Sequence, residues 1–377
     1  MAQLSQRVSS LAPSIIREMS YRRKPTSVDL SIGEPKLTPA DDILDSAWQA
    51  LRSGPQGYTH NAGLAELREI IARHYDFEGR AGIENVIVTV GSEEAVCLAM
   101  MSTLNPGDEV LFPSPGYPAY SGLAKLIGAT AVPYRISRET GLVPRAEEIA
   151  SCLTDKTRVL ILNGPSNPFG MVDSEDELEK IAQLVDERDL VVISDEIYRE
   201  IYFDAQPPPS IVSLTERSIF VSGLSKCCAM TGLRLGYLIA GSEFVKQTTL
   251  AHQLLVTCAP RLAQLAALEV FRNTEYLRKQ VTYYEKTREV ILELESQLPE
   301  DTPLILGGGA FYATIDVSSR TEDPLTFAIE LLEKKDVVVV PGVAFGEHGD
   351  WFWRMSYAAG PDTVREGLCR VAEFLSA

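Results

Sequence analysis

The stretch VVISDEIY, residues 191–198, is a short apolar segment that ends in a carboxylate at Asp195. Six similar apolar runs occur in the same part of the chain, at residues 86–90, 109–113, 130–136, 158–163, 219–223 and 236–241. Segments with apolar residues at helical spacing separate most of these runs. A strand that is apolar almost throughout must be covered on both faces. The runs therefore predict a doubly wound α/β fold with a mostly parallel, seven-stranded sheet.

The sequence pattern changes after about residue 275. A long charged helix is predicted at residues 275–298, followed by GGGAFYATIDV (307–317), a helix near 324–334, the run VVVV (337–340) and a closing helix near 361–376. The first 45 residues are too irregular to fold alone. We therefore predict a large domain at residues 46–275 and a smaller α+β domain made of residues 1–45 and 276–377, joined by the long helix.

Charge and composition narrow the possible classes of protein. The 377 residues include 52 acidic and 35 basic side chains, a formal net charge of -17, which disfavours nucleic acid and anionic membranes as partners. The six cysteines and four histidines show no metal-binding spacing, so no metal site is predicted. The sequence shows neither a cleavable apolar leader nor an apolar run of membrane-spanning length, which predicts a soluble, cytoplasmic protein.

Polar and aromatic residues follow several predicted strands, at the edge where an open α/β sheet binds its ligands. The candidates are the turn Gly91-Ser92-Glu93, Tyr117 with Tyr120, Asn167, Asp195 with Tyr198, and Lys226 with Ser225 and Arg234. The Ser92-Glu93 turn opens a predicted helix whose free N–H groups suit a phosphate, although Ser92 also fits a simple helix cap. Each signal alone is equally typical of a turn or a core residue, so their order along the chain carries the argument.

Asp195 and Lys226 carry the reactive chemistry of this set. A carboxylate at the mouth of a buried strand is costly unless it meets a positive partner, such as a protonated ring nitrogen or a metal. A lysine at the same edge can lose its proton when it is desolvated and then attack a carbonyl carbon.

The order of these motifs resembles that of the class I and II aminotransferases, the fold type I enzymes that use pyridoxal 5'-phosphate. The resemblance covers nearly the whole chain, through SIGEP (31–35), GYTHNAGLAELREII (57–71), PGVAFG (341–346) and WFWRMSYA (351–358). It implies an enzyme that exchanges an amino group between an L-amino acid and a 2-oxo acid.

The resemblance also implies roles around the cofactor ring. Lys226 is expected to form the Schiff base with the cofactor and then to move the proton between the substrate Cα and C4' of the cofactor. Asp195 is expected to keep the pyridine nitrogen protonated, which makes the ring an electron sink. Asn167 and Tyr198 are expected to bind the phenolic oxygen of the ring, and Tyr117 to stack on its face.

The same resemblance implies a phosphate site shared between two chains. The backbone N–H groups of Ser92 and Glu93, the Ser225 hydroxyl and the Arg234 guanidinium are expected to hold the phosphate. Tyr58 is expected to reach the phosphate from a second subunit, so the resemblance implies a homodimer.

The substrate α-carboxylate is expected to bind Arg354 through two parallel hydrogen bonds, with the Gly33 backbone and Asn167 closing over it. The chain departs from some relatives in two places. Tyr117 stands where they have a stacking tryptophan, and Tyr120 stands where they have a histidine behind the aspartate. The sequence therefore leaves open how the protonation of the ring nitrogen is tuned. No arginine that would grip a distal carboxylate can be aligned.

Two other functions fit parts of this pattern. A β-eliminating carbon-sulfur lyase of the same fold would use the same Lys, Asp, Asn and Tyr residues. A regulator that keeps the fold as a ligand sensor is the other alternative, but such relatives carry an additional DNA-binding module, for which the residues before SIGEP leave no room.

Glu93 gives an expectation about the substrate. Some bacterial aspartate aminotransferases have GGKQA where this chain has GSEEA, and their lysine is thought to attract the distal carboxylate of the substrate. With this charge reversed, neutral, aromatic or basic donors should be preferred over aspartate. In the alternative, Glu93 supplies only a backbone N–H and its carboxylate points into solvent.

Overall fold

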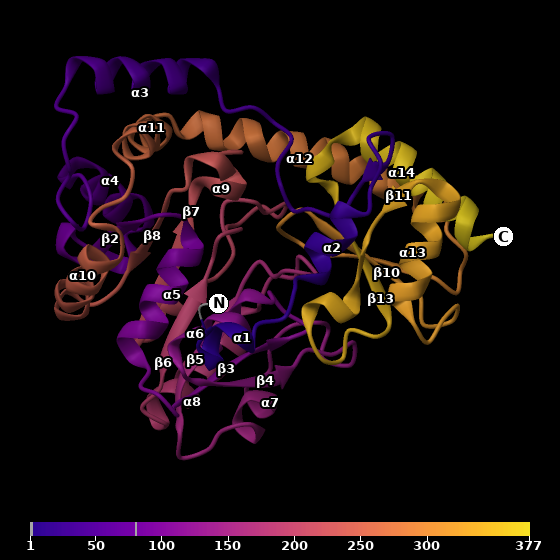
Figure 1. Ribbon diagram of the computed structural model, residues 1–377, viewed down its shortest axis with the longest axis horizontal. Helices are drawn as coiled ribbons and strands as arrows, with labels where there is room; N and C mark the ends of the chain where they lie inside the picture. The colour runs from indigo at the N-terminus through magenta and orange to yellow at the C-terminus, as the bar shows by residue number, and fades with distance from the viewer. Residues whose placement is uncertain (1–2, 80) are drawn as a thin grey trace.

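The computed structural model describes residues 3–79 and 81–377 of the chain. Its central feature is a seven-stranded sheet in the order β2-β8-β7-β6-β5-β3-β4 (Figure 1). The strands are β2 (Val86–Thr89), β3 (Glu109–Ser114), β4 (Thr130–Arg135), β5 (Thr157–Asn163), β6 (Val191–Asp195), β7 (Ser218–Gly223) and β8 (Gly236–Ile239). Each strand begins within one residue of the start predicted from the sequence, and the α/β fold with seven strands is confirmed.

The sheet is mostly parallel, because β8 alone runs opposite to the other six strands of this sheet. The connection between β7 and β8 contains the one-turn helix α9 (Leu224–Cys227) and a short 3-10 turn. This path brings β8 back beside β7, and it places Lys226 and Arg234 at the carboxyl end of the sheet.

Helices cover both faces of the sheet because successive strand residues point to opposite sides. On one face, Ile87 and Ile193 pack with α5, α6 and α10, whereas Val88 and Val192 face α4, α11, α7 and α8. The helices are α4 (Ala65–Tyr75), α5 (Ser92–Thr103), α6 (Ala119–Ile127), α7 (Ala146–Ser151), α8 (Glu175–Glu187), α10 (Ser242–Val256) and α11 (Arg261–Arg272). This covering accounts for the continuously apolar strands.

The C-terminal part of the chain forms a second, antiparallel sheet in the order β12-β13-β10-β9. Its elements are β9 (Leu304–Leu306), β10 (Tyr312–Asp316), β12 (Val340–Pro341) and β13 (Phe352–Ser356), with helices α13 (Pro324–Lys335) and α14 (Pro361–Leu375). The 21-residue helix α12 (Thr274–Leu294) runs from the large sheet toward this part (Figure 1). Across residues 3–79 and 81–377, every helix falls short of the length or apolar content that a membrane crossing needs.

The N-terminal segment contacts both parts of the molecule. Its strand β1 (Val28–Asp29) pairs in parallel with β11 (Val337–Val338), and its helix α2 (Ile15–Tyr21) lies against β12. In contrast, α1 (Gln6–Ser9) lies against α6, and α3 (Asp41–Ser53) packs on α11. The division into residues 46–275 and the two flanking segments stays a prediction, and its first boundary falls inside α3.

Candidate active site

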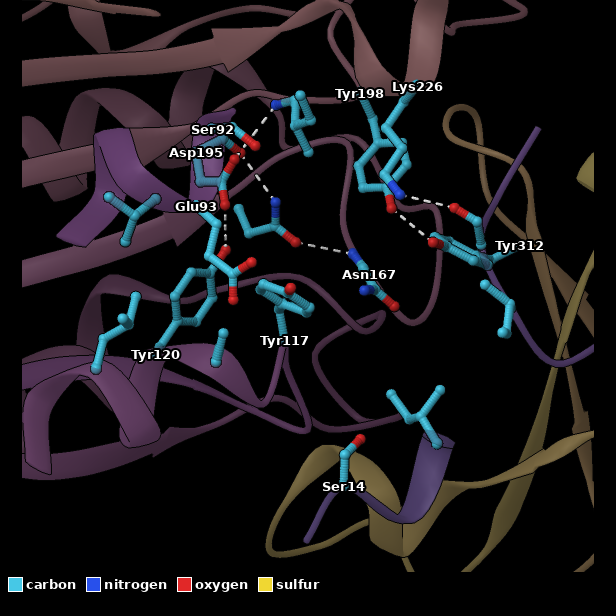
Figure 2. Close-up of a pocket in the computed structure, with 18 of the residues that line it drawn as sticks. Ser14, Ser92, Glu93, Tyr117, Tyr120, Asn167, Asp195, Tyr198, Lys226 and Tyr312 are labelled. Atoms are coloured by element: carbon cyan, nitrogen blue, oxygen red, sulfur yellow. Dashed lines mark hydrogen bonds between the residues drawn. The ribbon is translucent and has the colours of Figure 1, made fainter. Parts of the chain in front are cut away.

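A cavity with a volume of about 210 Å³ lies at the carboxyl ends of the large sheet (Figure 2). The predicted site residues that line it are Gly33, Ser92, Glu93, Tyr117, Asn167, Asp195, Tyr198, Lys226 and Arg354. Ser225, Arg234 and Tyr58 lie outside this lining. Ser225 is buried, Arg234 is exposed, and Tyr58 is a surface residue with 84% of its area exposed. The fold therefore brings most of the predicted residues to one cavity.

Asp195 ends β6 with a nearly buried carboxylate. The Tyr120 hydroxyl donates a hydrogen bond to its Oδ2 over 2.7 Å, and the Ile197 N–H donates to its Oδ1 over 3.3 Å. Burial raises the pKa of Asp195 to about 6, while the hydrogen bond from Tyr120 acts in the opposite direction. Asp195 is thus ionised at neutral pH inside an apolar site, where a protonated ring nitrogen would be a well-matched partner.

Lys226 lies on α9 with its amine inside the cavity, where Nζ donates a hydrogen bond to the Gly33 carbonyl over 2.7 Å (Figure 2). Burial, followed by the positive charge of Arg354, lowers the pKa of Lys226 to about 8, with a smaller contribution from Arg234. A neutral amine is therefore available near physiological pH, which is what a nucleophilic lysine needs.

The lowered pKa of Lys226 predicts how cofactor attachment depends on pH. Because only the neutral amine is nucleophilic, we expect the rate of covalent attachment to the apoenzyme to rise as the pH increases and to level off above about pH 8. Stopped-flow absorbance after mixing apoenzyme with pyridoxal phosphate measures this rate. A rate that continues to rise steeply beyond pH 10, as for an ordinary lysine, would contradict the environment assigned to Lys226.

Arg354 is a buried cation, and only part of its guanidinium is hydrogen-bonded to the described residues. Only 2% of its surface is exposed, and its guanidinium lies 4.4 Å above the Tyr312 ring. It donates to Asn167 Oδ1 over 3.1 Å and to the Ser31 carbonyl, whereas its Nε makes no hydrogen bond within the described part of the chain. Such a guanidinium suits a carboxylate that enters the cavity.

The turn before α5 forms a cradle that side chains would fill. A Cβ atom at Gly91, whose φ is +81°, would lie 2.6 Å from Arg234 Nη2, and one at Gly236 would lie 2.3 Å from the Ser92 nitrogen. The two glycines therefore let the guanidinium and the first N–H groups of α5 approach each other. A helix N-terminus with an arginine beside it is suited to bind a phosphate.

Tyr117 and Glu93 form the side of the cavity next to α5 and α6 (Figure 2). Burial raises the pKa of Tyr117, and the negative charges of Glu93 and Asp195 raise it further. In Figure 2 the Glu93 side chain points toward Tyr117 and Tyr120, so its carboxylate lies in the cavity. Glu93 is also an exposed residue, so its carboxylate lines the cavity and remains open to solvent.

Several residues of the site were not singled out from the sequence. Tyr312 lies on β10, and its hydroxyl is 2.5 Å from that of Tyr198. Asn163 joins two predicted residues, because its amide donates to the Asp195 carbonyl and accepts from the Asn167 N–H, each over 2.9 Å. Asn163 ends an apolar run, and this position was a signal in the sequence by which it could have been found. Tyr312 lies in GGGAFYATIDV, where its pattern is that of an ordinary core aromatic residue. Ser14, Ile16 and Arg17 also reach the cavity, from a segment with no motif.

The chemistry of these groups fits pyridoxal phosphate. A buried lysine with a lowered pKa, a buried carboxylate and a glycine-lined cradle are the features needed for its carbonyl carbon, its ring nitrogen and its phosphate. When it is bound, the cofactor supplies an electron sink for the bonds at the substrate Cα.

Comparison with known proteins gives the same assignment. The family model for aminotransferase class I and II matches residues 25–371. The chain is 32% identical over 380 residues to an aspartate aminotransferase of Pyrococcus horikoshii, covering 99% of this chain and 97% of the relative. The solved structure of an aspartate aminotransferase from Thermus thermophilus with maleate superposes with a TM-score of 0.91, at 32% identity and full coverage of both chains.

A second structure shows that relatives with different named substrates share this fold. The aromatic aminotransferase from Pyrococcus horikoshii superposes with a TM-score of 0.87 at 31% identity, covering 96% of this chain and 98% of that one. Members of the matched family are enzymes that use pyridoxal phosphate and act on amino acids and oxo acids. This protein belongs to the class I and II aminotransferases, with the pyridoxal-phosphate-dependent fold type I.

Proposed function

We propose that this aminotransferase uses neutral, aromatic or basic L-amino acids as donors in preference to aspartate, with a 2-oxo acid as acceptor. The observation that supports this preference is the Glu93 carboxylate in the cavity, beside Tyr117. Two like charges about 4 Å apart at an effective dielectric near 20 repel by up to about 4 kcal/mol. If screening leaves about 1 to 2 kcal/mol of this repulsion, a substrate with a distal carboxylate is disfavoured by roughly tenfold.

Arg17 is the cation that could oppose this effect, because it lines the same cavity from α2. Arg17 and Glu93 are both exposed. Both charges act on the Tyr117 hydroxyl, where Glu93 raises the pKa by more than Arg17 lowers it. At the Tyr117 hydroxyl, the negative charge of Glu93 therefore outweighs the positive charge of Arg17. The name aspartate aminotransferase applies to those relatives. The donor preference proposed for this protein rests on its own carboxylate at position 93.

The site suggests a division of work in the reaction. Arg354 and Asn167 bind the substrate α-carboxylate, which fixes the orientation of the bonds at Cα. Lys226 removes the proton from Cα and holds it on Nζ, beside the Gly33 carbonyl. Burial helps because it favours the neutral amine that accepts this proton. Asp195, held by Tyr120, stabilises positive charge on the ring nitrogen.

The preference is tested with isosteric donor pairs. We expect wild-type kcat/KM to be higher for asparagine than for aspartate, and Glu93→Lys to raise the aspartate-to-asparagine ratio of kcat/KM by at least about tenfold. Glu93→Gln removes only the charge and should give an intermediate ratio. The measurement is the half-reaction absorbance change with each donor. If wild type prefers aspartate, or if both variants leave the ratio unchanged, Glu93 does not select the substrate.

We also propose a homodimer in which Tyr58 contributes to the partner's phosphate site. Its side chain is 84% exposed, and α10 presents Leu250, Leu254 and Leu255 to solvent with 57%, 88% and 50% of their areas exposed. Apolar surface of this kind favours association. Light scattering coupled to size exclusion should give twice the monomer mass, and a monomer that binds the cofactor at full affinity would contradict the shared site.

A further inference from the structure

Glu94 connects the phosphate turn to the interior of the large domain. It is the third residue of α5, and its side chain folds back to accept a hydrogen bond from the Val90 N–H, just before Gly91. A glutamate at this helix position that reaches back over the N-cap fixes the first turn of the helix. The contact therefore holds the segment that presents the Ser92 and Glu93 N–H groups.

His252 faces the same carboxylate from α10. Its side chain is fully buried, and Nε2 lies 3.6 Å from Glu94 Oε2. On its other side, Nδ1 lies 2.8 Å from the Asn61 carbonyl, which can only accept, so Nδ1 carries a hydrogen. Asn61 belongs to the loop that also carries Tyr58, and its own side chain donates to the Thr257 carbonyl over 2.8 Å. The imidazole thus stands between the phosphate turn and the Tyr58 loop.

The pair is buried without complete hydrogen bonding. Within the described part of the chain, Glu94 Oε1, His252 Nε2 and the Thr248 hydroxyl oxygen make no hydrogen bond, although each is buried. Thr248 is one helical turn before His252, on the same face of α10. A carboxylate and an unprotonated nitrogen at 3.6 Å would repel, so the arrangement is stable when Nε2 also carries a hydrogen or when an internal water lies among these three groups. An ordinary core position would be filled by apolar residues at lower cost.

We propose that Glu94 and His252 act together as positioning residues that hold the phosphate turn against the Tyr58 loop, and so set the affinity for the phosphate of the cofactor. This inference rests on the proposed phosphate site at Ser92, Glu93 and Arg234. Neither residue touches the cofactor in this scheme. Their effect is transmitted by the hydrogen bond to Val90 and by the contact with Asn61.

The experiment compares binding of pyridoxal phosphate with binding of pyridoxal, which lacks the phosphate. Glu94→Gln keeps an acceptor for Val90 but removes the charge, and His252→Asn keeps a donor for Asn61 but removes the group that faces Glu94. We expect each variant to weaken binding of pyridoxal phosphate to the apoenzyme by about tenfold and to leave pyridoxal binding unchanged. The double variant should be no weaker than either single variant, because both remove the same contact.

Two controls separate this proposal from its premise. Glu243→Gln changes an exposed carboxylate at the start of α10 and should alter neither affinity. Arg234→Ala should weaken binding of pyridoxal phosphate alone; if it does not, the phosphate site itself is wrong. If Arg234→Ala behaves as expected, three results would each overturn the role of the pair. These are additive effects of Glu94→Gln and His252→Asn, equal losses of affinity for pyridoxal and pyridoxal phosphate, and an unchanged affinity for pyridoxal phosphate. Apoenzyme melting temperatures identify a variant whose loss is a general loss of stability.

Discussion

Replacing Lys226 with alanine is expected to lower kcat for amino transfer by about 10⁴-fold, equivalent to about 5 kcal/mol. The physical reason is that Lys226 supplies the lysine amine among the described residues that line the cavity, and that the pKa of this amine is lowered to about 8. The variant should still bind pyridoxal phosphate, because the cradle at Gly91 and Arg234 is unchanged. Single-turnover absorbance with a saturating donor measures the rate.

Chemical labelling checks the assignment directly. Borohydride reduction of the wild-type holoenzyme, followed by peptide mass spectrometry, should place the cofactor on Lys226. The matched control is Lys246→Ala, which removes an exposed lysine on α10 and should leave the rate and the label unchanged. A label on another lysine, or a Lys226→Ala variant with more than a few per cent of wild-type activity, would refute the role of Lys226.

Removing the Asp195 carboxylate is expected to lower kcat by about 10³-fold, equivalent to about 4 kcal/mol, at saturating cofactor. Without a buried negative charge, a positive ring nitrogen is no longer stabilised, and the site loses its means of drawing electrons from the substrate Cα. Asp195→Ala also leaves the Tyr120 hydroxyl without its acceptor, which costs about 1–3 kcal/mol of stability. The dissociation constant for the cofactor should change by much less than kcat, because the phosphate contacts remain.

Asp195→Asn separates charge from packing in this test. The amide has the same shape; its oxygen can still accept from the Ile197 N–H, and its NH2 can donate to the Tyr120 hydroxyl. The protein should therefore keep most of its stability while the rate falls almost as far as in Asp195→Ala. The melting temperature and the half-reaction rate are the two measurements. Wild-type rates in the Asn variant would mean that the carboxylate charge is not needed, and the role of Asp195 at the ring nitrogen would be wrong.

The sequence predicted the large sheet well because its signal is local. Six of the seven strands are short runs of mostly buried residues, whereas the edge strand β4 buries only Tyr134 fully. The start of each run is set by neighbours that differ in polarity. The strands of the small sheet were harder to predict from the sequence. The run VVVV, for example, divides between β11, which pairs with β1, and β12, which pairs with β13. A short segment of sequence does not contain the distant strands with which it pairs.

The sequence by itself therefore determined the fold class and placed Asp195, Asn167 and Lys226 at the ends of strands, where parallel strands bring them together. Only the tertiary structure decided which groups surround them. Tyr198 meets Tyr312 from 114 positions away, and Arg354 meets Asn167 from 187 positions away. The Glu94 carboxylate meets His252 in the same way, across two helices. Local patterns specify which side of an element is buried, but contacts between distant elements depend on how whole layers pack, and that packing sets the burial and charge on which each pKa depends.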